Sequence, residues 1–388
     1  MTIDLSRRTC VLHIGVHKTG TTAIQEFFQE NREALLKDHQ IYFSKKWHNY
    51  TGPLRSVFQP SPEKYHFNVK KGVNTAPLAE QQNKSFLRDL HSDVSASEPG
   101  HLLISAEDLS TFDLGQVQAL KAILDKSFAH YSIIAYLRHP VSWLPSSVQQ
   151  NLKNGKTLEQ ILRRPNNIKY RRKILPWISV FGRGAVVLRD YEFGKQTPLG
   201  SVGDLCDLLG VDAKRMHAPA MTSNESLTQT AALLLSQLNR LSPYYVDGRI
   251  SSDRVLNDYE TLMKIEGEKF ALPADVLKEV ENECSQDLTW LEENCGFSFM
   301  NPGENERTKQ GIPDATLERI ALALSDLCNE RTVYLIRALK AEALNLWQSD
   351  PAGAIEKLKE ILEIDPSDQK IGLAIQCVKE GKSPVLLL

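Results

Sequence analysis

The stretch His13–Gln25, HIGVHKTGTTAIQ, carries the strongest fold signal in the chain. It follows a short apolar run, 10–14, and leads into an amphipathic pattern. The apolar positions of that pattern are Ile24, Phe27, Phe28 and Leu35. This arrangement predicts a strand, a tight turn and a helix. The first backbone N–H groups of such a helix are unpaired, and together with the positive end of the helix dipole they favour a phosphate or sulfate group.

The spacing within the turn is close to that of a Walker A loop, but its lysine is displaced. Gly15 and Gly20 occupy the two glycine positions, and Thr22 occupies the hydroxyl position. The lysine precedes the second glycine as Lys18, and Thr21 stands where a Walker A loop has its lysine. Taken alone, the turn is equally compatible with an ordinary strand-to-helix connection that exposes a lysine.

Composition and charge narrow the class of protein. The chain has 388 residues, of which 41% are hydrophobic and 24% charged, so we expect one large globular domain with an appendage, or two domains. The net charge of −2 gives no overall reason to expect nucleic acid or an anionic membrane as a partner. The six cysteines include no CxxC pair, so neither a zinc site nor a redox motif is indicated.

No apolar run in the sequence has the length of a membrane span. The first residues, MTIDLSRRTC, contain no apolar signal core. We therefore expect a cytoplasmic protein without a membrane span, with its thiols reduced.

Further apolar runs predict a mostly parallel sheet. After the first run, four more strands are expected at 40–44, 101–105, 131–137 and 185–188. Helical patterns lie between them, for example at 81–93 and 116–128. Strands that alternate with helices of about 10 to 15 residues are typical of βαβ units. The expected fold class is therefore α/β, with a central parallel sheet flanked by helices in three layers, as in P-loop NTPases.

A polar, turn-rich stretch, 301–311, divides the chain. Residues 1–300 are expected to form the α/β domain, and residues 312–388 an all-α extension. One hairpin in the extension has the spacing of the second half of a tetratricopeptide repeat, although an ordinary helical hairpin fits as well. The residues with this spacing are Ala354, Leu358, Ile361 and Pro366. A single repeat cannot bury its own face, so we expect this extension to dock on the main domain, on another subunit or on a partner.

Charged residues follow two of the later strands. Glu107 comes just after the third expected strand, and Arg138 closes the fourth. Because ligands of parallel sheets bind at the carboxyl ends of the strands, Lys18, Glu107 and Arg138 are expected at one edge. Ser146 lies in the helix predicted after Arg138. An arginine and a hydroxyl can hold one phosphate from two sides, although each alone also fits a structural role as an ion pair or a helix cap.

Two motifs together resemble the sulfotransferases that use 3′-phosphoadenosine-5′-phosphosulfate (PAPS). They are HKTGTT after the first expected strand and YLRHPVSWLPSS after the fourth. The lysine-before-glycine order, which breaks the Walker A pattern, is the order that this family uses. The resemblance continues weakly through VVLRDYEFG, 186–194, and covers roughly residues 10–300. It is to the bacterial and carbohydrate-type members, and the helical extension lies outside it.

The resemblance implies a PAPS-dependent sulfotransferase and assigns residues to each end of the donor. The 5′-phosphosulfate would be bound by Lys18, Thr19, Gly20, Thr21 and Thr22. The 3′-phosphate would be bound by Arg138 and Ser146.

Sulfuryl transfer is close to phosphoryl transfer, in which catalysis depends on positioning and electrostatics. Lys18 is expected to neutralise charge on the bridging oxygen as the nucleotide leaves. A base must take the proton of the acceptor hydroxyl or amine. Glu107 is the first choice, because some carbohydrate sulfotransferases have a catalytic glutamate at a similar strand end, and His17 is the second. No carboxylate cluster suited to Mg²⁺ is evident in the sequence, so no metal is expected.

The sequence leaves the acceptor open. The segment 45–76 is rich in aromatic residues and has neither a helical nor a strand period, which is typical of binding loops and equally of plain surface excursions. Aromatic rings suit a saccharide, although phenols and lipids fit as well.

Two other functions remain open. One is a P-loop nucleotide kinase or NTPase, which would require a lysine after the second glycine. The other is a non-catalytic protein of sulfotransferase-like fold whose helical extension mediates self-association or partner binding.

Overall fold

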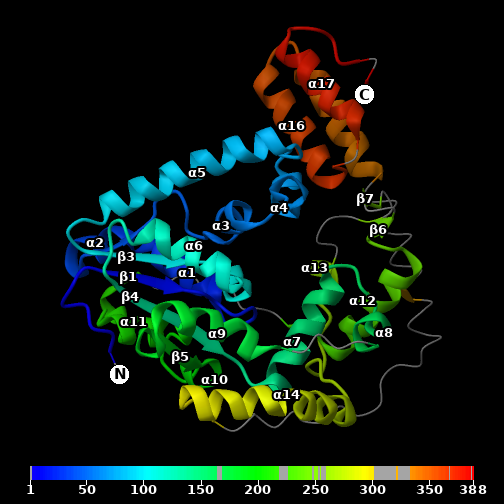
Figure 1. Ribbon diagram of the computed structural model, residues 1–388. Coiled ribbons are helices and arrows are strands. Elements are labelled where there is room, and N and C mark those ends of the chain that lie inside the picture. Colours follow the sequence, from blue (N-terminus) through cyan, green and yellow to red (C-terminus); the bar gives the residue numbers. More distant parts are fainter. Residues whose placement is uncertain are drawn as a thin grey trace. The chain divides into compact units, whose positions relative to one another are not determined.

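The computed structural model describes most of the chain, and Figure 1 shows its helices and strands. The described residues are 2–163, 168–217, 226–246, 249–251, 254, 259–300, 320–321, 333–366, 368–385 and 387–388. The predicted linker, 301–311, lies outside them. The domain boundary that this linker implies therefore stays a prediction.

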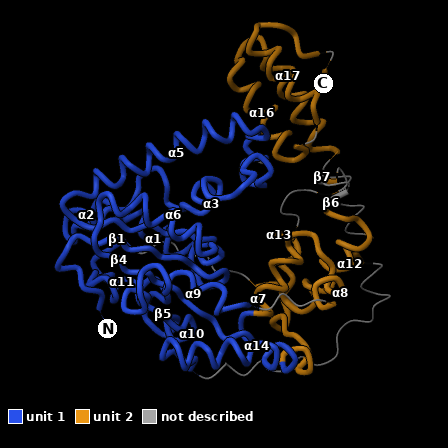
Figure 2. The backbone as a smooth tube through the Cα atoms, in the orientation of Figure 1, with its two compact units in different colours: residues 1–143, 167–223, 278–303 blue, residues 144–166, 224–277, 304–388 orange. Residues whose placement is uncertain are grey.

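Two compact units make up the chain, as Figure 2 shows. Unit 1 consists of Met1–Trp143, Asn167–Ser223 and Lys278–Gly303. Unit 2 consists of Leu144–Asn166, Asn224–Leu277 and Glu304–Leu388. Two helices run from one unit into the other, namely α7 (Pro140–Lys153) and α14 (Ala274–Cys295).

Unit 1 contains a five-stranded sheet in which all strands are parallel. The strands are β1 (Thr9–His13), β2 (Ile41–Phe43), β3 (His101–Ser105), β4 (His130–Leu137) and β5 (Val186–Asp190). Their order across the sheet is β2-β3-β1-β4-β5. In the centre, Val11 pairs with Leu103 on one side and Ser132 on the other. Each of the five expected strands is present, so the predicted α/β class with a parallel sheet is confirmed.

Helices cover both faces of this sheet. On one face, Val11, Leu103 and Ile134 form a core with helices that follow β1 and β5. These helices are α1 (Thr21–Glu30), α2 (Arg32–His39) and α11 (Ser201–Leu209). The neighbouring residues of β1, Cys10 and Leu12, point to the opposite face and are also fully buried. Strands buried on both faces form continuous apolar runs, which explains why they could be located in the sequence.

The segment 45–76 is largely helical, so the expectation that it is irregular is wrong. It contains α3 (Thr51–Phe58), η1 (Pro62–Lys64) and α4 (His66–Lys70), and it leads into α5 (Ala76–Ala96). Elements of 8, 3 and 5 residues are too short to show a helical period. Pro53 and Pro62 lie in first turns, where a backbone N–H is not needed. The Tyr50 ring packs on Phe86 of α5, with centroids 6.1 Å apart.

Three elements begin at the carboxyl edge of the sheet. The 3₁₀ helix η2 starts just after β3, α7 starts just after β4, and α10 follows β5 directly. The other elements of unit 1 are η2 (Glu107–Thr111), α6 (Leu114–Leu124), α9 (Tyr170–Phe181), η3 (Arg183–Ala185), α10 (Tyr191–Gly194) and η4 (Ala213–Arg215). Helices α6 and α9 pack against each other, and α9 also contacts η2.

The described part of unit 2 is mainly helical, with a short antiparallel pair of strands and an isolated antiparallel bridge between Thr228 and Lys269. Its elements besides those shared with unit 1 are α8 (Leu158–Leu162), α12 (Gln229–Leu241), β6 (Tyr245–Val246), β7 (Arg249–Ile250), α13 (Tyr259–Leu262), a helix at 333–346, α16 (Pro351–Ile364) and α17 (Gln369–Lys379). Ala354, Leu358 and Ile361 of the expected hairpin are buried in a small core with α17. Within the described residues from 333 on, the expected helical C-terminal region is confirmed, and its partner stays a prediction.

Among the described helices, none is both long and apolar enough to cross a lipid bilayer.

Candidate functional site

The β1–α1 loop (residues 14–20) lies against the backbone that follows β3. Gly15 has φ 71°, and a Cβ atom there would stand 2.7 Å from the Cα of Glu107. Only glycine therefore allows the loop to approach this corner. Gly20 caps α1 with φ 78°, and Lys18 has φ 69°, which is uncommon for a residue with a side chain. The loop thus brings Lys18 and Glu107 to the same edge of the sheet, as predicted from their positions after β1 and β3.

The three threonines of the motif have different environments. The Thr19 hydroxyl is buried and donates to the Val16 carbonyl at 2.5 Å, so it holds the loop closed. Thr21 is also buried, but its hydroxyl has no hydrogen-bond partner among the described residues. Thr22 is exposed. Thr21 and Thr22 therefore offer hydroxyls at the N-terminus of α1, whereas Thr19 could contribute its backbone N–H only.

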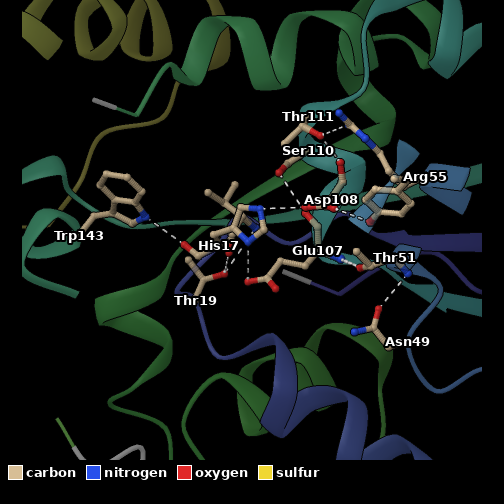
Figure 3. Close-up of polar contacts among 12 residues, drawn as sticks. His17, Thr19, Asn49, Thr51, Arg55, Glu107, Asp108, Ser110, Thr111 and Trp143 are labelled. Carbon is tan, nitrogen blue, oxygen red and sulfur yellow. Dashed lines mark hydrogen bonds and ion pairs between the residues drawn. The ribbon is translucent and has the colours of Figure 1, made fainter. Parts of the chain in front are cut away.

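His17 lies between two carboxylates of the η2 corner (residues 106–111), as Figure 3 shows. Its Nδ1 is 3.1 Å from Glu107 Oε1, and its Nε2 is 3.0 Å from Asp108 Oδ1. Burial alone would lower the pKa of His17, but hydrogen bonds to Asp108 and Glu107 raise it to about 9. His17 is therefore an imidazolium at neutral pH and donates to both carboxylates. The Trp143 indole N–H donates to the His17 carbonyl at 3.0 Å and fixes this part of the loop.

The backbone of the η2 corner is held by its neighbours. The Glu107 N–H donates to the Thr51 hydroxyl at 2.7 Å, and the Glu107 carbonyl accepts from Ser110 Oγ at 3.2 Å. Burial acts to raise the pKa of Glu107, but the hydrogen bond from His17, the charge of His17 and the charge of Lys18 together outweigh it, so the pKa is lowered. A similar balance lowers the pKa of Asp108. Both carboxylates are thus ionised and fixed in position.

The Lys18 ammonium interacts electrostatically with the Glu107 carboxylate of this corner. Burial lowers the pKa of Lys18, the Glu107 carboxylate opposes this shift, and Arg138 adds to it. Lys18, Glu107 and Arg138 therefore share one electrostatic environment at the carboxyl edge of the sheet.

Arg138 is held by α10 and by the first turn of α7. Its Nε donates to Glu192 Oε1 at 2.9 Å and to Ser142 Oγ at 3.3 Å, and its guanidinium lies 5.4 Å from the centre of the Tyr191 ring. Its terminal nitrogens make no hydrogen bond within the described part of the chain. Tyr191 also borders the β1–α1 loop, because a Cβ atom at Gly20 would come within 3.3 Å of its ring.

Ser146 lies in the part of α7 that belongs to unit 2, one residue after Pro145. It is partly buried. Its pairing with Arg138 stays a prediction. The serine that contacts Arg138 within unit 1 is Ser142.

A buried cluster of polar side chains joins the ends of β1 and β3 to α1 next to the site. His13 Nδ1 lies 2.9 Å from Ser105 Oγ, and the Gln25 amide donates to the same oxygen at 3.2 Å. Burial lowers the pKa of His13 to about 4, so this imidazole is neutral. Its hydrogen bonds link β1, β3 and α1 at the point where the β1–α1 loop begins. Ser105 is fully buried in it, whereas Glu107 two residues later is partly exposed.

Several contacting residues were not foreseen from the sequence. Asp108 and Glu192 are the carboxylate partners of His17 and Arg138. Asp108 adjoins Glu107 in the sequence SAEDLS, and Glu192 lies in DYEFG. Their positions next to residues already singled out in the sequence are the signal that could have identified them. Within the described residues, no group of three or more histidine, cysteine or carboxylate side chains has the arrangement of a metal site.

Comparison with known proteins gives matches to solved structures only. No family model and no curated protein matches the chain. The crystal structure of a sulfotransferase from Alicyclobacillus acidocaldarius matches 74% of this chain and 96% of its own, with 14% identity and a TM-score of 0.39. The sulfotransferase domain of the Synechococcus PCC 7002 olefin synthase matches 72% and 95%, with 14% identity and a TM-score of 0.29.

Proposed function

We propose that the chain is a sulfotransferase that moves the sulfuryl group of PAPS to a hydroxyl or amine of an acceptor. The observation that carries this proposal is that two kinds of group lie at one sheet edge, where the loop at Gly15 packs against the backbone of Glu107. Lys18 and the open N-terminus of α1 are suited to an anion, and the ionised carboxylate of Glu107 beside them is suited to a proton.

The donor would be bound by the β1–α1 loop and by Arg138. Among the described residues, the backbone N–H groups at Gly20, Thr21 and Thr22 and the Thr21 hydroxyl have no hydrogen-bond partner, and these donors support a 5′-phosphosulfate site. The terminal nitrogens of Arg138 support a 3′-phosphate site, since its Nε is already held by Glu192. Ser146 is proposed as a second ligand of that phosphate. Thr19 would contribute through its backbone alone.

The transfer itself needs few groups. The acceptor oxygen forms a bond to sulfur while the bond from sulfur to the 5′-phosphate oxygen breaks, and the electron pair stays on that oxygen. Lys18 neutralises the charge that develops there. The acceptor proton passes to Glu107. All of these charges are accounted for without a metal ion.

The two candidate bases have different roles in this proposal. His17 already carries a proton on each nitrogen, because both nitrogens face carboxylates at about 3 Å. It therefore cannot accept a proton, and Glu107 is the proposed base. His17 instead orients Glu107 and adds a positive charge beside the sulfuryl oxygens. A carboxylate with a lowered pKa is a weak base, which suits a reaction in which the proton leaves late.

A saccharide is the proposed acceptor class. A cavity of about 200 Å³ between α3, α4 and α5 has aromatic walls and polar groups at its rim. Trp47 and Phe67 form walls, and Gln82, Asn83 and Asp89 supply amide and carboxylate groups. Flat rings with adjacent hydrogen-bonding groups suit a sugar.

The direct test is a comparison of thermal shifts with 3′-phosphoadenosine-5′-phosphate (PAP), the product nucleotide, and with ATP plus Mg²⁺. We expect PAP to raise the melting temperature in proportion to ln(1 + [L]/Kd). The Arg138→Ala variant should lose most of this shift, and the exposed Arg171→Ala variant should keep it. Stabilisation by ATP with Mg²⁺ alone would favour a P-loop kinase or NTPase, and no shift with either nucleotide would favour the non-catalytic alternative.

A further inference from the structure

The chain segment that follows α14 (residues 296–300, the α14 tail) packs against the turn that carries Arg138. Gly296 ends the helix with φ 57°, a left-handed conformation that glycine adopts without strain. The Phe297 N–H donates back to the Leu291 carbonyl at 3.2 Å, which is the hydrogen bond expected at such a helix end. The α14 tail therefore leaves the helix in a fixed direction and stays within unit 1.

Aromatic rings join the α14 tail to this turn. The Phe299 ring centre lies 5.3 Å from that of His139, edge to face, and 5.7 Å from that of Tyr170 in α9. Phe297 packs edge to face on Phe299, with ring centres 5.0 Å apart. His139 is buried and Tyr170 is fully buried, whereas Phe299 is half-buried. The α14 tail thus contributes one side of an apolar cluster that fixes the rings of Tyr170 and His139.

Tyr170 and His139 hold the backbone of the turn. The Tyr170 hydroxyl donates to the Arg138 carbonyl. The His139 carbonyl accepts from the backbone N–H groups of Ser142 and Trp143, at 3.0 and 2.8 Å, and so begins α7. Because Tyr170 is fully buried, its hydroxyl contacts the protein backbone and is closed off from a bound nucleotide. The peptide group after Arg138 is therefore fixed in orientation, and with it the start of the arginine side chain.

A second link runs from the α14 tail to the side chain of Arg138. The buried carboxylate of Asp190 accepts the Met300 N–H at 3.0 Å on one oxygen and the Glu192 N–H at 2.9 Å on the other. The Glu192 carboxylate in turn accepts from Arg138 Nε at 2.9 Å. The α14 tail thus reaches the backbone of Arg138 through Tyr170 and its guanidinium through Asp190.

The orientation of an arginine decides how well it binds a phosphate. A guanidinium binds a phosphate best through two parallel N–H···O bonds, which requires the plane of the group to be correct as well as its position. Among the described contacts, Glu192 holds Nε of Arg138 and leaves the terminal nitrogens as donors for a phosphate. A small displacement of Arg138 would keep its charge and lose the paired geometry. A nucleotide with a 3′-phosphate would then lose affinity, and a nucleotide without one would not.

We propose that Tyr170, Phe299 and Asp190 are positioning residues that set the orientation of Arg138 and thereby the selectivity for nucleotides with a 3′-phosphate. This role rests on the proposed function, because it requires Arg138 to bind that phosphate. The three residues act through Arg138 and do not touch the nucleotide. Tyr170 and Asp190 depend on the α14 tail for their own positions.

The test is a calorimetric titration of the full chain with PAP and with adenosine 5′-phosphosulfate, a nucleotide without a 3′-phosphate. Tyr170→Phe removes one hydrogen bond and keeps the buried ring, so the Kd of PAP should rise by about 3- to 10-fold. The Kd of adenosine 5′-phosphosulfate should stay within a factor of about two. In rate measurements, the KM for PAPS should rise while kcat is unchanged. The control is Tyr131→Phe, which removes a phenol hydroxyl at the other end of β4 and should leave both Kd values unchanged.

Two further comparisons separate positioning from a general loss of structure. Phe299→Leu should weaken PAP binding in the same way, and Phe299→Tyr, which keeps the aromatic contacts, should restore it. In the Arg138→Ala background, Tyr170→Phe should have no further effect on PAP binding, because the residue that it positions is gone. If Tyr170→Phe fails to fold, the pair of variants at the half-buried Phe299 decides alone.

Two results would overturn the positioning role. One is unchanged PAP binding by Tyr170→Phe and Phe299→Leu beside a loss in Arg138→Ala, which leaves the proposed function intact. The other is an equal loss of affinity for both nucleotides, which would mean that these residues only maintain the fold. If the wild type does not bind PAP, or if Arg138→Ala binds PAP as tightly as the wild type, the proposed function fails and the positioning role fails with it.

Discussion

The β1–α1 loop and the η2 corner meet at one edge of the sheet, but they present different kinds of group. The loop offers the backbone N–H groups at the start of α1, the Thr21 hydroxyl, which has no partner among the described residues, and the ammonium of Lys18. The corner offers two ionised carboxylates that are fixed by an imidazolium. An anion needs donors that are still unpaired, whereas a base needs a carboxylate that is kept charged and aligned. We therefore expect the β1–α1 loop to bind the donor and the η2 corner to accept the proton. A substitution in one of these two regions should then affect one of these two steps.

The largest expected effect is at the corner. Glu107→Gln should lower kcat by about 10²- to 10⁴-fold, because the acceptor proton loses its base. PAP affinity should stay within a factor of about two, since the change leaves the β1–α1 loop intact. The control is Glu30→Gln on the exposed part of α1, which removes the same charge. Steady-state rates and PAP titrations check both values, and full activity of Glu107→Gln would exclude this residue as the base.

In the loop, Lys18→Ala should lower kcat by about 10²- to 10³-fold, the usual cost of removing one group that stabilises transition-state charge. PAP should bind with only moderately reduced affinity, because the backbone donors of α1 remain. Exposed Lys37→Ala on α2 serves as the control. Single-turnover rates with PAPS separate chemistry from product release. If Lys18→Ala turns over at the wild-type rate, Lys18 has no part in the mechanism. The assignment of charge stabilisation to the loop would then be wrong.

Arg138→Ala should act on binding rather than on chemistry. Loss of a charge-assisted contact to the 3′-phosphate should raise the Kd of PAP by about 10- to 100-fold, with kcat restored at saturating donor. Adenosine 5′-phosphosulfate, which lacks the 3′-phosphate, should bind wild type and variant alike. Calorimetric titration of both nucleotides measures this contrast. Equal losses for the two ligands would mean that Arg138 has a structural role through its ion pair with Glu192.

The sequence predicts the sheet better than it predicts the site. Continuous apolar runs such as β1 and β4 are buried on both faces, so their composition alone locates them. The positions of Lys18, Glu107 and Arg138 after strands follow from the topology of parallel sheets. The pairing of His17 with Asp108 depends on how the β1–α1 loop and η2 pack, and no local pattern encodes that. The short helices of 45–76 were missed because their lengths are near one or two turns.

The smallest expected effect is on stability, and it tests whether His17 is held as an imidazolium. The pKa of His17 is raised from 6.5 to about 9 in the folded chain. Its contribution to the free energy of unfolding is therefore fully present below about pH 6.5 and is lost as the pH rises through 9. Because the side chain is 45% exposed, solvent screening reduces this contribution to about 1 kcal/mol.

The variant His17→Asn removes the titrating group and keeps a hydrogen-bond donor. Urea unfolding of wild type and variant at pH 6 and pH 9.5 should give a difference in stability that is larger at pH 6, since titration of all other groups cancels in the comparison. The difference should shrink in Asp108→Asn, which removes one of the two carboxylates that raise the pKa. A difference that is the same at both pH values would mean that folding does not raise the pKa of His17, and would return it to the position of a candidate base.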